Sequence, residues 1–208
     1  MKIAVINETS AKTRNPDILT ALAPLGHEVY NLGMDPSKEQ PELTYIHTGL
    51  MAAIALNSGS CDLVIGGCGT GQGFLNSVMQ YPGVFAGLIE SPLDAWLFSQ
   101  INGGNCISLA LNKGYGWGAD INLKYIFERF FQDSFGQGYP THRQESQRHS
   151  REILKQISVS VHRPFTEAAL SIPKPYLKEV LEFPGFGEYM KRTPSSQKLL
   201  ERISSFNE

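Results

Sequence analysis

The sequence predicts an α/β fold, a Rossmann-like five-stranded parallel sheet in three α/β/α layers, followed by a helical C-terminal extension. Two observations predict it. Short apolar runs alternate with helical segments at spacings of roughly 25–30 residues, which is typical of a parallel sheet joined by helices. Within the runs, apolar and polar residues do not alternate, as expected for strands buried on both faces.

Local signals mark the start of two of the expected helices. Asn15 is a candidate N-cap because Pro16 follows it, and Ser91 opens another helix with proline at the next position. The expected strands are 2–6, 27–33, 61–67, 83–90 and 105–111. The expected helices are 14–24, 44–59, one from about residue 73, 91–104 and 119–131.

The character of the chain changes after about residue 134, where polar residues replace the apolar runs. A helix is predicted from about residue 142, and short amphipathic pieces broken by prolines follow it. We therefore expect an α/β domain at 1–140 and a helical extension at 141–208 that packs on another surface, such as a partner subunit.

Composition excludes several classes of protein. The chain is 41% hydrophobic and 18% charged with a net charge of -2, so nothing favours disorder or nucleic-acid binding. No apolar run approaches the length of a membrane span or of a signal-peptide core, and we expect a cytoplasmic protein. Three sparse cysteines without a CxxC pair indicate free thiols rather than disulfides, and they give little support for a zinc site.

A glycine-rich loop follows the third expected strand and contains Cys68. Its spacing fits neither the dinucleotide fingerprint nor the Walker loop, and Thr70 breaks the nucleophile-elbow pattern by one position. A strand end, small residues and a following helix direct backbone N–H groups toward one spot that favours an anion and a lowered thiol pKa. A thiolate there suits attack on a carbonyl, or proton abstraction beside one.

The sequence CGTGQG at 68–73 resembles the CGTGxG loop of the ribose-5-phosphate isomerase B and galactose-6-phosphate isomerase family. The resemblance runs without a gap over 62–105 and includes Pro92, Asn102 and Asn105. It implies aldose–ketose isomerisation of a small sugar phosphate through a cis-enediolate, without a cofactor. It also implies a homodimer or homotetramer with shared active sites.

Residue roles follow from the same resemblance. Cys68 would be the base, Thr70 would assist proton movement between the two substrate oxygens, and the loop amides would hold the enediolate. The amides are those of Gly69, Gly71 and Gly73. The other candidate substrate-binding residues are Glu8, Thr9, Tyr45, His47, Asn102, Arg143 and Arg148, with Arg151 as a further candidate arginine.

The chain departs from the family at positions linked to opening of the sugar ring. Glu8-Thr9 stands where the family has Asp-His, and Ile101 replaces a second histidine. We therefore expect a short or open-chain substrate. Two alternatives stay open at this stage: a thiol hydrolase or transferase with Cys68 as nucleophile, and a sugar-phosphate-binding subunit with little catalysis.

Overall fold

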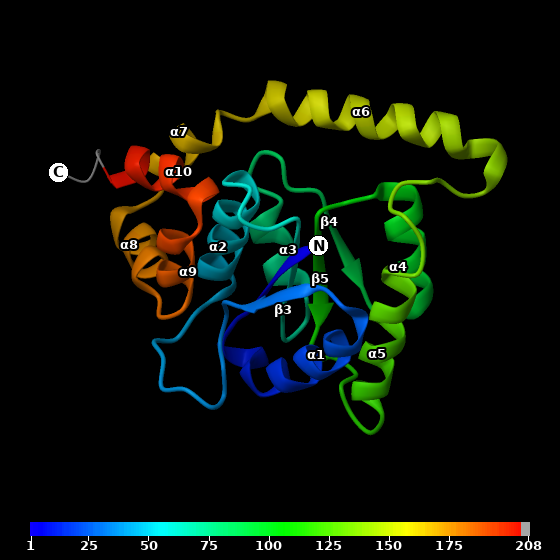
Figure 1. Ribbon diagram of the computed structural model, residues 1–208, viewed down its shortest axis with the longest axis horizontal. Coiled ribbons are helices and arrows are strands. Elements are labelled where there is room, and N and C mark those ends of the chain that lie inside the picture. Colours follow the sequence, from blue (N-terminus) through cyan, green and yellow to red (C-terminus); the bar gives the residue numbers. More distant parts are fainter. Residues whose placement is uncertain (205–208) are drawn as a thin grey trace.

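The structure, a computed structural model, describes residues 1–204 (Figure 1). Five parallel strands form one sheet in the order β2-β1-β3-β5-β4. The predicted fold class is confirmed. The strands are β1 (Lys2–Asn7), β2 (Glu28–Asn31), β3 (Leu63–Cys68), β4 (Ala86–Ile89) and β5 (Cys106–Ala110).

Helices cover both faces of the sheet, because its strands are apolar on both sides. Helices α1, α4 and α5 lie on one face, and α2 and α3 lie on the other. Their bounds are α1 (Asn15–Leu22), α2 (Tyr45–Asn57), α3 (Gln72–Val78), α4 (Pro92–Leu97) and α5 (Ala119–Phe130). Short turns complete this part: η1 (Thr9–Arg14), η2 (Ala23–Leu25) and the single π-helical turn η3 (Phe98–Asn102).

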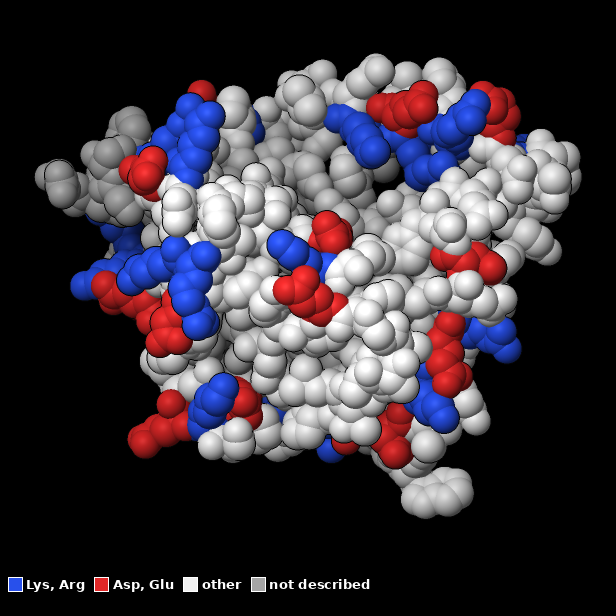
Figure 2. All heavy atoms as spheres, in the orientation of Figure 1, with Lys and Arg blue, Asp and Glu red and all other residues white. Residues whose placement is uncertain are grey.

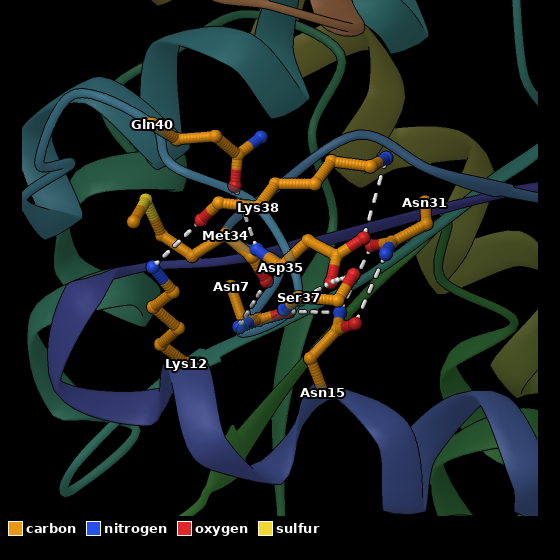
Figure 3. Close-up of polar contacts among 9 residues, drawn as sticks. All are labelled: Asn7, Lys12, Asn15, Asn31, Met34, Asp35, Ser37, Lys38 and Gln40. Atoms are coloured by element: carbon orange, nitrogen blue, oxygen red, sulfur yellow. Dashed lines mark hydrogen bonds and ion pairs between the residues drawn. The ribbon is translucent and has the colours of Figure 1, made fainter.

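The predicted cap at Asn15 is wrong. Arg14 is the N-cap of α1, and Asn15 is the first helical residue, with its side chain turned into the protein. Its amide group bonds to Asn7 at 2.8 Å and to Asn31 at 2.9 Å, joining the ends of β1 and β2 (Figure 3). A buried amide network explains the residue better than capping, since a buried polar side chain requires partners. The cap predicted at Ser91 is confirmed, because its hydroxyl accepts from the N–H of Asp94.

The C-terminal helices are η4 (Thr141–Arg143), α6 (Gln144–Val161), α7 (Phe165–Leu170), α8 (Lys174–Glu182), α9 (Phe186–Arg192) and α10 (Pro194–Ser204). Those from α7 onward pack on one another, and α8 packs against α2 (Figure 1). Apolar residues of α7–α10 join those of α2 and β3 in one buried cluster, and the Tyr189 hydroxyl donates to the Ser60 carbonyl at 2.5 Å. The boundary expected near residue 140 stays a prediction.

Helix α6 differs from the other C-terminal helices because it extends across the top of Figure 1. The buried residue of α6 is Ser158, and the Ser158 hydroxyl accepts from the N–H of Gly83. The large apolar side chains of Ile153, Leu154, Ile157, Val159 and Val161 are exposed. This 18-residue helix therefore keeps an apolar face exposed to solvent.

The face shown in Figure 2 carries acidic and basic side chains side by side, without an extended area of one sign. Within residues 1–204, no helix is both long and apolar enough to cross a bilayer.

Candidate active site

Cys68 is the last residue of β3, at the carboxyl edge of the sheet. The register pairs Cys68 with Ala110 of β5, and it pairs Gly67 with Asn7 at the end of β1. Glu8 therefore follows β1 at the position beside Cys68, one strand spacing of about 4.8 Å away. Both residues are largely buried, with exposed fractions of 6% for Cys68 and 8% for Glu8. The third strand thus delivers the thiol next to a carboxyl group.

Ser10 connects Glu8 to the glycine loop. The Ser10 hydroxyl donates to Glu8 Oε1, and the Ser10 N–H donates to Glu8 Oε2 at 3.0 Å. The same hydroxyl oxygen accepts the N–H of Gly69 at 3.1 Å. A chain of hydrogen bonds therefore runs from the buried carboxyl group to the peptide that follows Cys68.

The loop after β5 closes the other side of the glycine loop. The Gly69 carbonyl accepts from the N–H groups of Asn112 and Lys113, each at 2.9 Å. The Asn112 side chain donates to the Ser10 carbonyl at 2.7 Å. Three loops, from the ends of β1, β3 and β5, therefore interlock around Gly69, which fixes the backbone beside the thiol.

Thr70 and the first turn of α3 complete this side of the site. The Thr70 hydroxyl lies 4.0 Å from Cys68 Sγ and accepts from the Gln72 N–H. Among residues 1–204, no acceptor pairs with the N–H groups of Thr70 and Gly73. These two amides are available to an oxygen of a ligand. The Gly71 amide, by contrast, donates to the Cys68 carbonyl at 3.3 Å.

Thr9 and Tyr45 lie at the same edge through the loop that precedes α2. The Thr9 hydroxyl accepts from the Leu43 N–H at 2.9 Å, and the Thr9 N–H donates to the Leu43 carbonyl at 3.0 Å. The ring of Tyr45 covers Gly73 so closely that a Cβ on Gly73 would lie 2.9 Å from it. Thr9 therefore fixes the backbone of the loop that precedes α2. The family has an imidazole at the position of Thr9.

His47 is engaged elsewhere in the chain. Its Nδ1 bonds to the N–H and hydroxyl of Thr44 in the cap of α2, and its Nε2 lies 2.7 Å from Glu179 of α8. Its ring also packs on that of Tyr176. Both ring nitrogens therefore have partners within the chain, and His47 ties the C-terminal helices to α2.

Asn102, Arg143 and Arg148 lie away from this cluster. Asn102 ends η3, which precedes β5 at the amino edge of the sheet, whereas Cys68 lies at the carboxyl edge. Strand β5 alone separates the two edges by about 13 Å. Arg143 and Arg148 are exposed at the start of α6, and Arg148 pairs with Glu145. Arg151 is used structurally, because it donates to the carbonyls of Ile101 and Gly136.

Ser10 and Asn112 are site residues that the sequence did not indicate. The one local signal is that Ser10 follows an acidic residue by two positions, a spacing that favours a side-chain bond to the backbone. Asn112 has no such signal, since its partners lie far away in the sequence.

The other two cysteines, Cys61 and Cys106, are buried at the amino edge. Burial raises the pKa of the Cys61 thiol to about 12, and Asp62 adds to the shift. Burial also raises the pKa of Cys106 well above its ordinary value. Both thiols are therefore held in the neutral form and are suited to packing.

A hollow opens at the carboxyl edge, beside the start of α5. It has a volume of about 410 Å³, and Ile89, Leu109 and Leu123 form its apolar floor. The ion pair between Lys113 and Glu90 lies among its lining residues. Cys68 is not among them, but Ala110, which pairs with Cys68 in the sheet, is. Within residues 1–204, no group of three or more His, Cys, Asp or Glu side chains is placed to hold a metal.

Comparisons with known proteins agree with the fold and with the loop. A solved 4-deoxy-L-threo-5-hexosulose-uronate ketol-isomerase, complexed with a tartrate, is 40% identical, covers 100% of this chain and 99% of its own, and has a TM-score of 0.94. A ribose-5-phosphate isomerase from Vibrio parahaemolyticus is 39% identical over 99% of both chains, with a TM-score of 0.92. The 4-deoxy-4-sulfo-D-erythrose isomerase of Clostridium sp. (strain MSTE9) is 26% identical over 78% of this chain and 99% of its own.

The model of the ribose/galactose isomerase family matches residues 3–154, which include the glycine loop and α6 as far as its middle. The family expected from the CGTGQG loop is confirmed. The chain therefore belongs to the ribose/galactose isomerase family and is a sugar isomerase.

Proposed function

We propose that the chain interconverts an aldose and a ketose through a cis-enediolate, with Cys68 as the base. The observation that carries this proposal is the gathering of a thiol, a hydroxyl and unpaired amides at one strand end: Cys68, Thr70 and the N–H of Gly73. The thiolate removes the proton on the carbon beside the carbonyl, and the amides hold the negative oxygen that forms. The proton then returns to the neighbouring carbon.

The substrate we propose is a small open-chain sugar with an anionic group at the end far from its carbonyl. Thr9 supports this, because its hydroxyl holds the Leu43 backbone and no imidazole is present there to open a ring. Two relatives are named for such sugars. A 4-deoxy-4-sulfo tetrose has no oxygen on carbon 4, and a 4-deoxy-5-hexosulose uronate has neither that oxygen nor a hydroxyl on carbon 5. Neither can close the ordinary five- or six-membered ring onto carbon 1. The anionic end is a phosphate, a carboxylate or a sulfonate.

We further propose a dimer in which each site takes residues from both chains. Asn102, Arg143 and Arg148 lie at the amino edge, out of reach of Cys68 in the same chain. The exposed apolar face of α6 offers a surface for the second chain. The amino edge of one chain would then supply cations to the carboxyl edge of the other, where the substrate anion lies.

The test is incorporation of solvent deuterium into three sugars: 4-deoxy-L-threo-5-hexosulose uronate, 4-deoxy-4-sulfo-D-erythrose and D-ribose 5-phosphate. Wild type should exchange and convert at least one, whereas Cys68→Ala should lose both activities by about a thousandfold. Cys61→Ala is the matched control, because that buried thiol lies at the other edge. Undiminished exchange in Cys68→Ala would refute the base, and a clear preference for ribose 5-phosphate would refute the open-chain substrate.

A further inference from the structure

Isomerisation through an enediol needs two proton transfers, and Cys68 accounts for the one between carbons. The second proton leaves the hydroxyl oxygen of the starting sugar and reaches its carbonyl oxygen. The resemblance assigns that transfer to Thr70. In the structure the Thr70 hydroxyl contacts the Cys68 sulfur and the Gln72 amide, and no carboxyl group is bonded to it within residues 1–204.

Ser10 is connected differently. Its hydroxyl donates to Glu8 Oε1, and Glu8 Oε2 accepts the Ser10 backbone N–H. Both oxygens of the carboxyl group are therefore directed to one serine. A hydroxyl bonded to a carboxylate can pass a proton to it and take the proton back, which an isolated hydroxyl cannot do.

Because Glu8 is buried and Ser10 is exposed, a substrate can exchange a proton with the Glu8 carboxylate through the Ser10 hydroxyl. Glu8 is 8% exposed, while Ser10 is exposed to solvent at the mouth of the site. The Ser10 oxygen is one hydrogen bond from the Gly69 amide, the peptide unit that follows Cys68. Asn112, bonded to the Ser10 carbonyl, and Glu8, bonded to its N–H, hold the residue in this position.

We propose that Ser10 is a further catalytic residue whose hydroxyl, together with Glu8, carries the proton between the two oxygens of the enediol. The step balances without another reactant. The substrate hydroxyl gives its proton to Ser10 Oγ while the Ser10 proton moves to Glu8 Oε1. The same path in reverse delivers a proton to the second substrate oxygen and restores the Glu8 carboxylate.

This inference rests on the proposed enediolate chemistry, but different experimental results would refute the relay and the enediolate chemistry. Removal of a carbon-bound proton by Cys68 does not need Ser10, so deuterium exchange should survive when the relay is lost. Net conversion of aldose to ketose does need the relay, so it should fall. The ratio of exchange to conversion therefore reports on Ser10 specifically.

The experiment measures both rates in D2O with 4-deoxy-L-threo-5-hexosulose uronate and D-ribose 5-phosphate, in wild type, Ser10→Ala and Glu8→Gln. We expect both variants to lose conversion by about a hundredfold while exchange changes by less than about threefold. Ser10→Thr, which keeps a hydroxyl, should recover most of the conversion.

The chain offers a matched control in the neighbouring loop. Asp35 and Ser37 have the same spacing, and Asp35 Oδ1 accepts from both the hydroxyl and the N–H of Ser37 (Figure 3). Ser37→Ala removes an equivalent acid–serine bond at an exposed position and should change neither rate.

Three outcomes would overturn the relay. Equal losses of exchange and conversion would show that Ser10 only fixes the Gly69 backbone, and unchanged conversion would show that Thr70 suffices. No recovery in Ser10→Thr would show that the hydroxyl is not the active group. A wild type that exchanges neither of these sugars nor 4-deoxy-4-sulfo-D-erythrose would instead overturn the proposed function, and the relay with it.

Discussion

The two edges of the sheet carry different chemistry. At the carboxyl edge, Cys68 ends a strand among glycines, beside a carboxyl group and hydroxyls, and three loops interlock around Gly69. At the amino edge, Cys61 and Cys106 are buried, and burial raises the pKa of both thiols. The same type of side chain therefore has a proposed chemical role at one edge and a packing role at the other.

The difference also concerns other predicted substrate-binding residues. Asn102 belongs to the amino edge, about the length of strand β5 away from the thiol. Helix α6, which begins after Arg143 and carries Arg148, packs on the turn that ends at Asn102. One chain therefore holds the predicted acid–base groups at one edge and the predicted cationic groups at the other.

The largest effect should come from mixing two inactive chains. Cys68→Ala lacks the base, and Arg143→Ala/Arg148→Ala lacks the proposed anion-binding groups, so each alone should lose at least a hundredfold in activity. In a one-to-one mixture, half of the dimers carry one intact site, and about a quarter of wild-type activity should return. The measurement is the isomerisation rate after unfolding and refolding the chains together. No return of activity would contradict a site shared in this way.

The apolar face of α6 should control assembly. Ile157→Asp places a charge on that face and should weaken association by about a hundredfold or more, because burying an unpaired carboxylate is costly. Gln156→Asp changes the adjacent exposed residue and is the control. Sedimentation velocity over a range of concentrations measures the dimer fraction. Equal association of the two variants would place the interface on another surface.

Packing at the carboxyl edge should tolerate no side chain at Gly66. A Cβ there would lie 2.1 Å from the ring of Phe74, which is fully buried. Gly66→Ala should therefore lower the free energy of unfolding by about 3 kcal/mol, since neither the strand nor the ring has room to move. Gly116→Ala is the control, because nothing lies within 4 Å of its Cβ. Urea unfolding compares the two, and equal midpoints would refute the expected clash.

The smallest effect should appear at alkaline pH, at the amino edge. Burial raises the pKa of Cys61 from 9.0 to about 12, so the folded protein holds a proton that the unfolded chain releases. Its contribution is complete below pH 9 and is lost as the pH rises toward 12. Between pH 7 and pH 10 the free energy of unfolding should fall by about 1 kcal/mol more in wild type than in Cys61→Ala. Parallel curves for the two proteins would contradict this assignment.

Local patterns in the sequence were sufficient for the sheet and for the glycine loop. Strands such as β1 and β3 contain continuous apolar runs, and the thiol is the last residue of β3. Residues close together in the chain produce these features, so the sequence predicts them. The N-cap role of Asn15 was wrong because its side chain meets two other asparagines at the ends of neighbouring strands.

Local sequence features are sufficient to predict the order of strands and helices, the thiol at a strand end and the family to which the chain belongs. Which side chains meet at that strand end depends on the packing of distant segments. Ser10 reaches Gly69 across 59 residues, and His47 bonds to Glu179 across 132 residues. Such contacts depend on how the loops and the C-terminal helices pack, and local propensity and spacing carry no information about packing at that separation.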